Sequence, residues 1–286
     1  MNQSTCLRVL RRVSAAVLLA ALLAGLLCAC RKEQETEQNQ TPVTPDEPVT
    51  PDEPDEPQQP ELSVGEQTHR KTYVSEQGEE LFSAALAVPS PEGNEAMQSI
   101  AEYYSVWLDD MKYYCDTMLT ETASEGLAWA RETGGVFTPY AIESAYEVTR
   151  FDGEVFSAIR DLYESTGGVH PSYSMLAETF DVKNGGRMSV FTLFSGEDEQ
   201  EVLSLLLGKV QALAEKKMQA QPDLYYENYR ELLSSTFDPL CFALTDAGLT
   251  LYWQTYSIGP YVSGVQRFDI PYAELSGVMD ERWMLS

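Results

Sequence analysis

Histidine is scarce in this chain, and the common nucleotide and hydrolase motifs are missing. There are two histidines, His69 and His170, and neither belongs to a His-Glu-x-x-His pattern. Because a metal centre needs several ligands, this scarcity argues against a zinc site. The sequence also lacks Gly-x-Gly-x-x-Gly, Gly-x-x-x-x-Gly-Lys-Ser and Gly-x-Ser-x-Gly. We therefore predict no metal, no cofactor, no nucleotide site and no catalytic residue.

Basic residues are few as well. The chain has 19 lysines and arginines against 45 aspartates and glutamates, a formal net charge of −26. Residues 62–286 hold 14 of the basic and 35 of the acidic residues, which leaves −21. Such a surface repels nucleic acid and attracts a cationic protein. The alternative is that the acidity only keeps a surface protein soluble.

The N-terminal segment predicts the compartment. Three arginines precede an apolar run over residues 13–29, and the run ends in Ala29-Cys30. A charged segment followed by an apolar run is typical of a secretory signal. A small residue just before a cysteine resembles the bacterial lipobox, so we expect residues 1–29 to be a lipoprotein signal peptide and Cys30 to carry the lipid. An uncleaved anchor helix is the alternative, although the run is short for a bilayer. The prediction is a lipid anchor on the extracytoplasmic face of the cell membrane.

Residues 30–61 are rich in proline, glutamate and aspartate, and they contain two variant copies of Thr-Pro-Asp-Glu-Pro. Alternating prolines and repelling carboxylates cannot build a core, so we predict a disordered, extended linker. The remaining residues are enough for one large domain or two small ones. We divide them into an N-terminal part, 62–165, and a C-terminal domain, 166–286.

The hydrophobic pattern of residues 62–286 predicts an α+β fold, an antiparallel sheet of hairpins with two main helices packed on it. Turns are expected at Asp152-Gly153 and Asn184-Gly185. Aromatic residues off the apolar stripe of the first helix, among them Tyr103 and Tyr113, must be covered by the sheet or by a partner. The expected strands are 71–76, 81–88, 137–150, 154–164, 172–182, 187–194, 240–245, 249–257 and 265–270, and the expected helices are 96–119, 197–219 and 223–235.

Two cysteines lie beyond the predicted signal and lipidation site. Cys115 falls on an apolar helix stripe, and Cys241 lies at the start of a strand. Outside the cytoplasm they could form one disulfide. They could equally be free and buried, and the sequence leaves both alternatives open.

Two motifs stand out in the C-terminal half. The first is Gly167-Gly168-Val169-His170-Pro171, and the second is Tyr256-x-Ile258-x-Pro260-Tyr261-x-x-Gly264. The glycines allow positive φ and Pro171 keeps His170 out of the α region, so the first motif predicts a fixed turn between two strands. His170 is expected to pin that turn by hydrogen bonds. The alternative is a wall-modifying hydrolase that uses His170.

Together the motifs resemble an extracytoplasmic family, the RsiV-like domains of unknown function 3298 with their usual N-terminal companion domain. The family includes the lysozyme-sensing part of anti-sigma-V factors and a region ahead of the catalytic domain in some peptidoglycan deacetylases. Further residues match its hairpin, turn and closing segment: Asp181, Gly185, Met188, Val190, Leu193, Phe194, Phe242, Leu244, Thr245, Gly248, Leu249, Ile270, Pro271, Tyr272 and Leu275.

The resemblance implies a non-catalytic envelope lipoprotein that binds or senses peptidoglycan or a lysozyme-like cationic protein. It does not identify the binding residues. A deacetylase-associated hydrolase and a purely structural or assembly lipoprotein are the alternatives.

Overall fold

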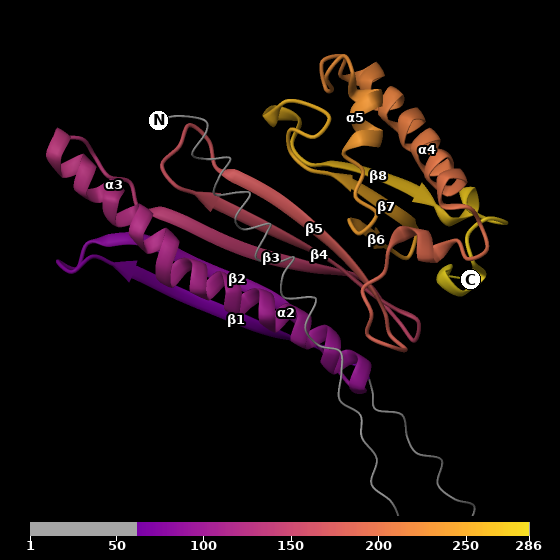
Figure 1. The fold of residues 1–286 in the computed structure, drawn as a ribbon, viewed down its shortest axis with the longest axis horizontal. Helices are drawn as coiled ribbons and strands as arrows, with labels where there is room; N and C mark the ends of the chain where they lie inside the picture. The colour runs from indigo at the N-terminus through magenta and orange to yellow at the C-terminus, as the bar shows by residue number, and fades with distance from the viewer. Residues whose placement is uncertain (1–61, 286) are drawn as a thin grey trace, which may run out of the picture. The chain divides into compact units, whose positions relative to one another are not determined.

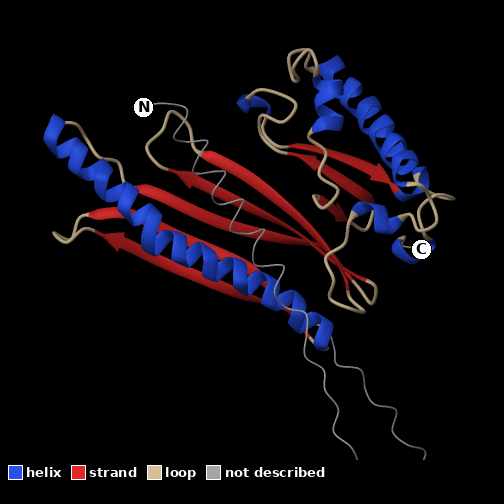
Figure 2. Cartoon of the chain, in the orientation of Figure 1, coloured by secondary structure: helices blue, strands red, loops and turns tan. Residues whose placement is uncertain are grey.

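The computed structural model describes residues 62–285, and these residues form an α+β fold built around two sheets (Figure 1). The predicted fold class is confirmed, although the strands make two sheets and not one. Each sheet has its own long helix (Figure 2). The predicted signal peptide, the linker and Cys30 lie outside the described residues. No helix within residues 62–285 combines the length and the apolarity that a membrane crossing requires.

The larger sheet has five strands in the order β1-β2-β3-β4-β5. Three of its pairings are antiparallel, but β2 and β3 run parallel where Phe82–Ala85 pairs with Tyr140–Glu143. The expectation of hairpins throughout was wrong here, because a helical crossover joins these two strands and returns the chain in the same direction. The strands are β1 (Ser63–Val74), β2 (Glu80–Glu92), β3 (Tyr140–Phe151), β4 (Val155–Ser165) and β5 (Ser172–Asp181).

The crossover is one long helix in three parts. Asn94 caps α2 (Glu95–Tyr114) by accepting a hydrogen bond from Met97 N at 3.0 Å. A π-helical turn, Cys115–Leu119, follows, and α3 (Thr120–Thr133) continues to a left-handed Gly134. The helix therefore extends well past the predicted end at residue 119. Its buried side chains cover one face of the larger sheet and form the N-terminal core.

Most of the off-stripe aromatic residues of α2 reach the sheet, as expected. The Tyr103 hydroxyl donates to Glu178 Oε1 at 2.9 Å, and the Tyr114 hydroxyl donates to Glu164 Oε1 at 2.7 Å. The Trp107 ring lies 3.8 Å from the guanidinium carbon of Arg160. Tyr113 is the exception, since it remains 70% exposed.

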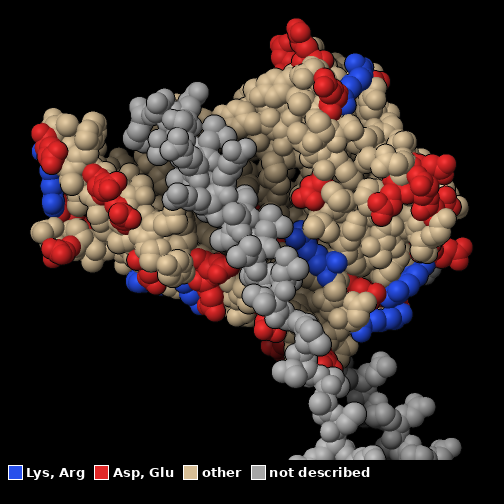
Figure 3. Space-filling model, viewed as in Figure 1, with Lys and Arg blue, Asp and Glu red and all other residues tan. Residues whose placement is uncertain are grey.

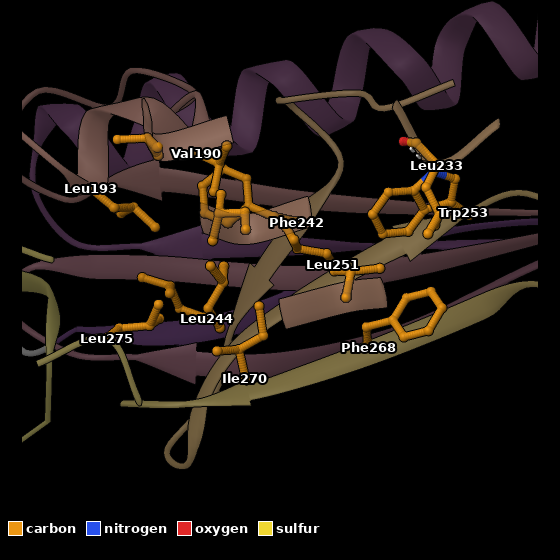
Figure 4. Close-up of a cluster of buried hydrophobic side chains, with 14 of the residues drawn as sticks. Val190, Leu193, Leu233, Phe242, Leu244, Leu251, Trp253, Phe268, Ile270 and Leu275 are labelled. Atoms are coloured by element: carbon orange, nitrogen blue, oxygen red, sulfur yellow. Dashed lines mark hydrogen bonds between the residues drawn. The ribbon is translucent and has the colours of Figure 1, made fainter. Parts of the chain in front are cut away.

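The smaller sheet consists of β6 (Phe242–Leu244), β7 (Gly248–Trp253) and β8 (Gln266–Pro271), all antiparallel. Helix α4 (Glu199–Ala220) packs on it, and the Asp198 carboxylate caps that helix by accepting from Gln200 N and Glu201 N. In the short helix α5 (Tyr229–Ser235), the Leu233 carbonyl accepts a hydrogen bond from the indole N–H of Trp253. Figure 4 shows the apolar core that these elements share.

Polar side chains on the second face of the larger sheet join it to β6. The Thr149 hydroxyl donates to Leu244 O at 2.8 Å, and Ser157 Oγ accepts from Leu244 N at 3.0 Å. The Thr179 hydroxyl donates to Phe242 O at 3.0 Å. Three hydroxyls thus satisfy backbone groups of an edge strand that would otherwise be buried without partners.

Three expected elements are shorter or different. Residues 187–194 are not a strand: a single bridge joins Phe180 to Arg187, and Val190–Leu193 forms a 3-10 turn. The Ser189 hydroxyl begins that turn by accepting from Phe191 N, which competes with strand pairing. The expected helix at 223–235 is helical only from Tyr229, and the expected strand at 249–257 ends at Trp253.

The two cysteines are not bonded to each other. Cys115 and Cys241 are both free and buried, and they lie in separate apolar clusters. Cys115 is the first residue of the π-helical turn and packs in the core between that helix and the larger sheet, whereas Cys241 packs with Ile159 and Ala177 on the opposite face of the sheet. The sheet separates the two thiols, so the disulfide alternative is corrected and the free, buried alternative holds.

Candidate functional site

The two sequence motifs meet in space. The first lies in the loop between β4 and β5, and the second lies between β7 and β8. We call the contact between residues 166–171 and residues 254–264 the motif junction. The predicted division between residues 165 and 166 falls in this loop, inside the larger sheet. The junction therefore ties together two parts of the chain that are far apart in sequence.

His170 is at the centre of the motif junction. Its Nδ1 lies 3.1 Å from Pro171 O, and its Nε2 lies 3.1 Å from the Tyr256 hydroxyl. Because a carbonyl only accepts, Nδ1 carries the proton in the neutral ring and Nε2 accepts from Tyr256. The imidazole also stacks on Tyr261, with ring centres 3.9 Å apart and an interplanar angle of 21°. Both ring nitrogens are thus engaged.

Tyr261 and Gln254 hold the second motif against β5. The Tyr261 hydroxyl donates to Pro171 O at 3.0 Å, so this carbonyl receives two hydrogen bonds. The Gln254 amide pairs with both backbone groups of Met175 on the edge strand, accepting from its N–H and donating to its carbonyl. In this way Gln254 imitates one step of a strand ladder. Sequence reasoning missed Gln254, because a single glutamine after a strand carries no motif.

The glycines of the motifs have different roles. Gly167 has φ of +73° and Gly264 has φ of +63° with ψ of −162°, conformations that favour glycine. Gly168 is not among the residues with positive φ, so only one of the two paired glycines has the predicted conformation. A Cβ on Gly167 would also lie 3.2 Å from the Tyr140 ring. The turn therefore depends on Gly167.

Tyr256 has an unusual backbone. Its φ of +69° is the only positive φ of a non-glycine residue within 62–285. The left-handed conformation is unfavourable for a side chain of this size, and such outliers gather where the surroundings fix them. Here the hydrogen bond to His170 helps to fix it, and the ring stays 52% exposed. The fold therefore holds a tyrosine outward in a strained conformation.

The junction is a surface feature with apolar and aromatic groups. His170 is exposed, and its sequence neighbour Val169 is fully exposed. Val262, next to Tyr261, is 85% exposed. The rings of Tyr256 and Tyr261 lie 5.8 Å apart. Rigid tyrosine rings with a few polar tips suit contact with a protein or a sugar surface, because they bury area at small entropic cost.

The part of the chain that the structure describes was also searched for a possible metal centre. Within residues 62–285 no group of three histidine, cysteine, aspartate or glutamate side chains is placed to hold a metal ion. His69 lies on β1, 3.4 Å from the Tyr73 hydroxyl, and not at the motif junction.

Comparison with known proteins finds a family whose profile matches part of the chain. The profile of a family described as "Protein of unknown function (DUF3298)" matches residues 197–273, which contain the second motif but not the first. A DUF3298 domain is present at these residues. No protein of established annotation matches the chain closely.

Two solved structures share the fold around the DUF3298 domain. One is a DUF3298 family member from Bacteroides fragilis, with 17% identity, a TM-score of 0.58, and coverage of 78% of this chain and 96% of that one. The other is a DUF3298 family protein from Pseudomonas aeruginosa, with 16% identity, a TM-score of 0.50, and coverage of 79% and 98%. At identities this low, the likeness shows a shared fold and nothing about function. The resemblance to anti-sigma-V factors and the companion domain stay predictions.

Proposed function

We propose that this chain is a non-catalytic binding or sensing module of the bacterial envelope, held at the membrane by a lipid on Cys30. Its ligand is a lysozyme-like cationic protein or cell-wall glycan. The observation that carries the proposal is the motif junction, in which stacking on Tyr261 and two hydrogen bonds hold His170 as part of an exposed surface. A ring held in this way is suited to shaping a contact surface.

The charge of the chain supports a cationic protein partner. Residues 62–286 carry a formal charge of −21, and on the face drawn in Figure 3 acidic side chains outnumber basic ones. An acidic surface speeds the association of a basic protein, and salt weakens that effect over a Debye length of about 8 Å at physiological ionic strength. The exposed Tyr256 ring would add contact area once the partner has arrived.

Binding can be tested with the full-length chain and a C-type lysozyme over a range of salt concentrations. We expect association at low salt that weakens as salt is added. Tyr256→Asn should weaken binding several-fold, since asparagine tolerates the left-handed backbone but removes the ring. The matched control is Tyr113→Asn, which removes another exposed tyrosine from α2. Absence of lysozyme binding at low salt would leave glycan as the ligand, to be measured with purified peptidoglycan.

Catalysis can be tested in parallel by turnover assays on peptidoglycan. The proposal expects no turnover by the wild type. His170→Ala should lower the melting temperature by loosening the motif junction, and His69→Ala, the only other histidine change available, serves as the control. Turnover that disappears in a folded His170→Ala variant but persists in His69→Ala would replace the binding module with a hydrolase.

A further inference from the structure

A groove of about 440 Å³ opens where α4 ends and the chain turns into α5. It lies inside the DUF3298 domain, and none of its lining residues belongs to the motif junction, although the Tyr226 N–H donates to Ile258 O of the second motif at 3.0 Å. Its volume falls in the range typical of ligand sites, about 300–1,000 Å³. A helix was expected over residues 223–235, but residues 223–228 form turns and bends. Four of them, Asp223, Tyr225, Tyr226 and Glu227, line this groove.

Three tyrosines, Tyr225, Tyr226 and Tyr229, line the groove. Tyr225 and Tyr229 are buried, with ring centres 5.4 Å apart. The Tyr225 hydroxyl is held by Gln266 Oε1 at 2.8 Å, and burial raises the pKa of Tyr225 to about 12. Two of the three lining tyrosines are therefore fixed in the core beneath the groove, and Tyr226 is the more exposed of the three. Aromatic faces of this kind attract cations.

The rim of the groove is acidic. Glu215, Asp223 and Glu227 line it together with one basic residue, Arg230, so its formal charge is −2. The last turn of α4 also faces it, and the free carbonyls of a helix C-terminus carry partial negative charge. Figure 3 shows acidic and basic side chains side by side in its upper part, over the end of α4 and the following loop. These charges disfavour an anionic ligand.

Arg230 is the chain's own cation at this groove. Its Nη2 lies 2.9 Å from Glu215 Oε1, and its guanidinium carbon lies 5.0 Å from the centre of the Tyr229 ring. Hydrogen bonding to Arg230 holds the pKa of the Glu215 carboxyl below its usual value. Both partners are about half exposed, so this ion pair is weak and open to exchange. Asp223 and Glu227 have no ion-pair partner within residues 62–285.

We propose that this groove binds an arginine or lysine side chain presented by a basic protein. The cation would lie over the tyrosine rings, between Asp223 and Glu227 on the loop and the carbonyl end of α4. Arg230 would compete with it for Glu215. The identity of the basic protein rests on the proposed function. Binding of a cationic side chain in the groove can be tested without that protein.

The test uses the full-length chain and an acetylated hexa-arginine amide as the probe, measured by calorimetry at low salt. Asp223→Asn with Glu227→Gln should weaken binding about tenfold, since two unpaired carboxylates leave the site. The control, Glu121→Gln with Glu125→Gln on exposed positions of α3, makes the same change in net charge. It should change binding less than twofold, because those positions lie outside the groove. Equal weakening by both double variants would show unspecific attraction and overturn the proposal.

Arg230→Gln supplies a second measurement with the opposite sign. It removes the internal competitor and should tighten hexa-arginine binding several-fold. Arg131→Gln is the matched control. Arg131 lies on α3 and forms an ion pair with Glu79, and both side chains are about as exposed as those of the Arg230–Glu215 pair. Tightening of the same size in both variants, or in neither, would overturn the proposal.

Lysozyme is then compared on the same variants. If hexa-arginine binding depends on the groove while lysozyme does not bind at all, the groove stands and the proposed partner falls. If lysozyme binds the wild type and the groove variant equally, the binding function stands and the groove is not its site. A neutral chitin oligosaccharide that competes with hexa-arginine would assign the groove to sugar and overturn the cation proposal.

Discussion

Arg160 and Glu178 form an ion pair that is wholly buried beneath α2. Arg160 Nη2 donates to Glu178 Oε1 at 2.6 Å, and each side chain is 1% exposed. Tyr103 donates to the same carboxylate oxygen, and Trp107 covers the guanidinium. The pair lies on adjacent strands, β4 and β5, and both of its neighbours come from the helix. Polar contacts therefore fix the position of α2 on the sheet in addition to the apolar ones.

Removing one member of this pair should destabilise the protein strongly. Glu178→Ala leaves a buried guanidinium without its counter-ion, and we expect a loss of about 3–5 kcal/mol in the free energy of unfolding. The double variant Arg160→Met with Glu178→Leu should recover most of that loss, because it leaves no buried charge. Urea unfolding of the three proteins measures this. A double variant that is no more stable than Glu178→Ala would contradict the account.

Gly167 and Gly168 provide a matched pair at the motif junction. Gly167→Ala should lower the free energy of unfolding by about 1–2 kcal/mol, since it forces a Cβ into the left-handed region and toward Tyr140. Gly168→Ala should change it by less than about 0.5 kcal/mol, because the nearest atom to its added Cβ is His170 O at 3.6 Å. Thermal or urea unfolding distinguishes them. Equal losses would show that the backbone of the turn differs from the one described.

The two buried thiols should be unreactive in the folded protein. Burial raises the pKa of Cys115 to about 11 and also raises the pKa of Cys241. The thiolate is the reactive form, so at pH 8 a thiol reagent should label neither residue in folded 62–286. Both should react in denaturant without any reductant. A fast-reacting thiol in the folded protein would indicate that one of the sites opens to solvent.

The same pKa shift predicts how stability depends on pH. The folded-state pKa of Cys115 lies above its ordinary value of 9.0, so the stabilisation is complete below pH 9 and is lost as the pH rises toward 11. Burial also raises the pKa of Tyr103 to about 12, which extends the loss to higher pH. We expect the melting temperature to fall between pH 9 and 11. A Cys115→Ala variant should show a shallower fall over that interval.

Lipidation of Cys30 is a prediction on residues outside the described structure. Cys30→Ser should leave an unprocessed precursor in the membrane fraction, detected by its larger mass and by the absence of fatty-acid labelling. Cys28→Ser is the control, since Leu27 gives that cysteine a poor cleavage context. Normal labelling of the Cys30→Ser variant would refute the assignment.

Local sequence patterns were enough to predict the helices and strands in which the capping residue, the turn residues and the apolar stripe all indicate the same element. Helix α4 has the capping Asp198 and an apolar stripe, and the β3–β4 hairpin has Asp152-Gly153 at its turn. Strand β1 was placed only in part, because most of its residues are polar and its alternation is weak. The β2–β3 parallel pairing depends on a long-range crossover that no window of sequence contains.

The candidate site was likewise predicted only in part. The turn and the hydrogen-bonded role of His170 followed from its glycines and Pro171, as the structure shows. That the second motif supplies the stacking Tyr261 and the hydrogen-bonding Tyr256 did not follow, since these contacts join residues about ninety positions apart. The groove was missed because a continuous helix was expected where the chain turns between α4 and α5.

The π-helical turn between α2 and α3 takes up one residue more than a regular α-helical turn would hold. Buried positions continue through it at Cys115, Leu119, Ala123 and Leu127, each four residues from the last, and the Thr120 hydroxyl donates to Cys115 O. In a regular α-helix four residues overshoot one turn by about 40°, so such a series would drift off the sheet. The wider turn resets that drift. Deleting one residue, Thr117 for example, would let the segment close as a regular α-helix, in which the buried Leu108 and Leu127 stand 18 residues or about five turns apart and keep the same face. In evolution, this segment would therefore accept the loss of one residue more readily than the gain of another.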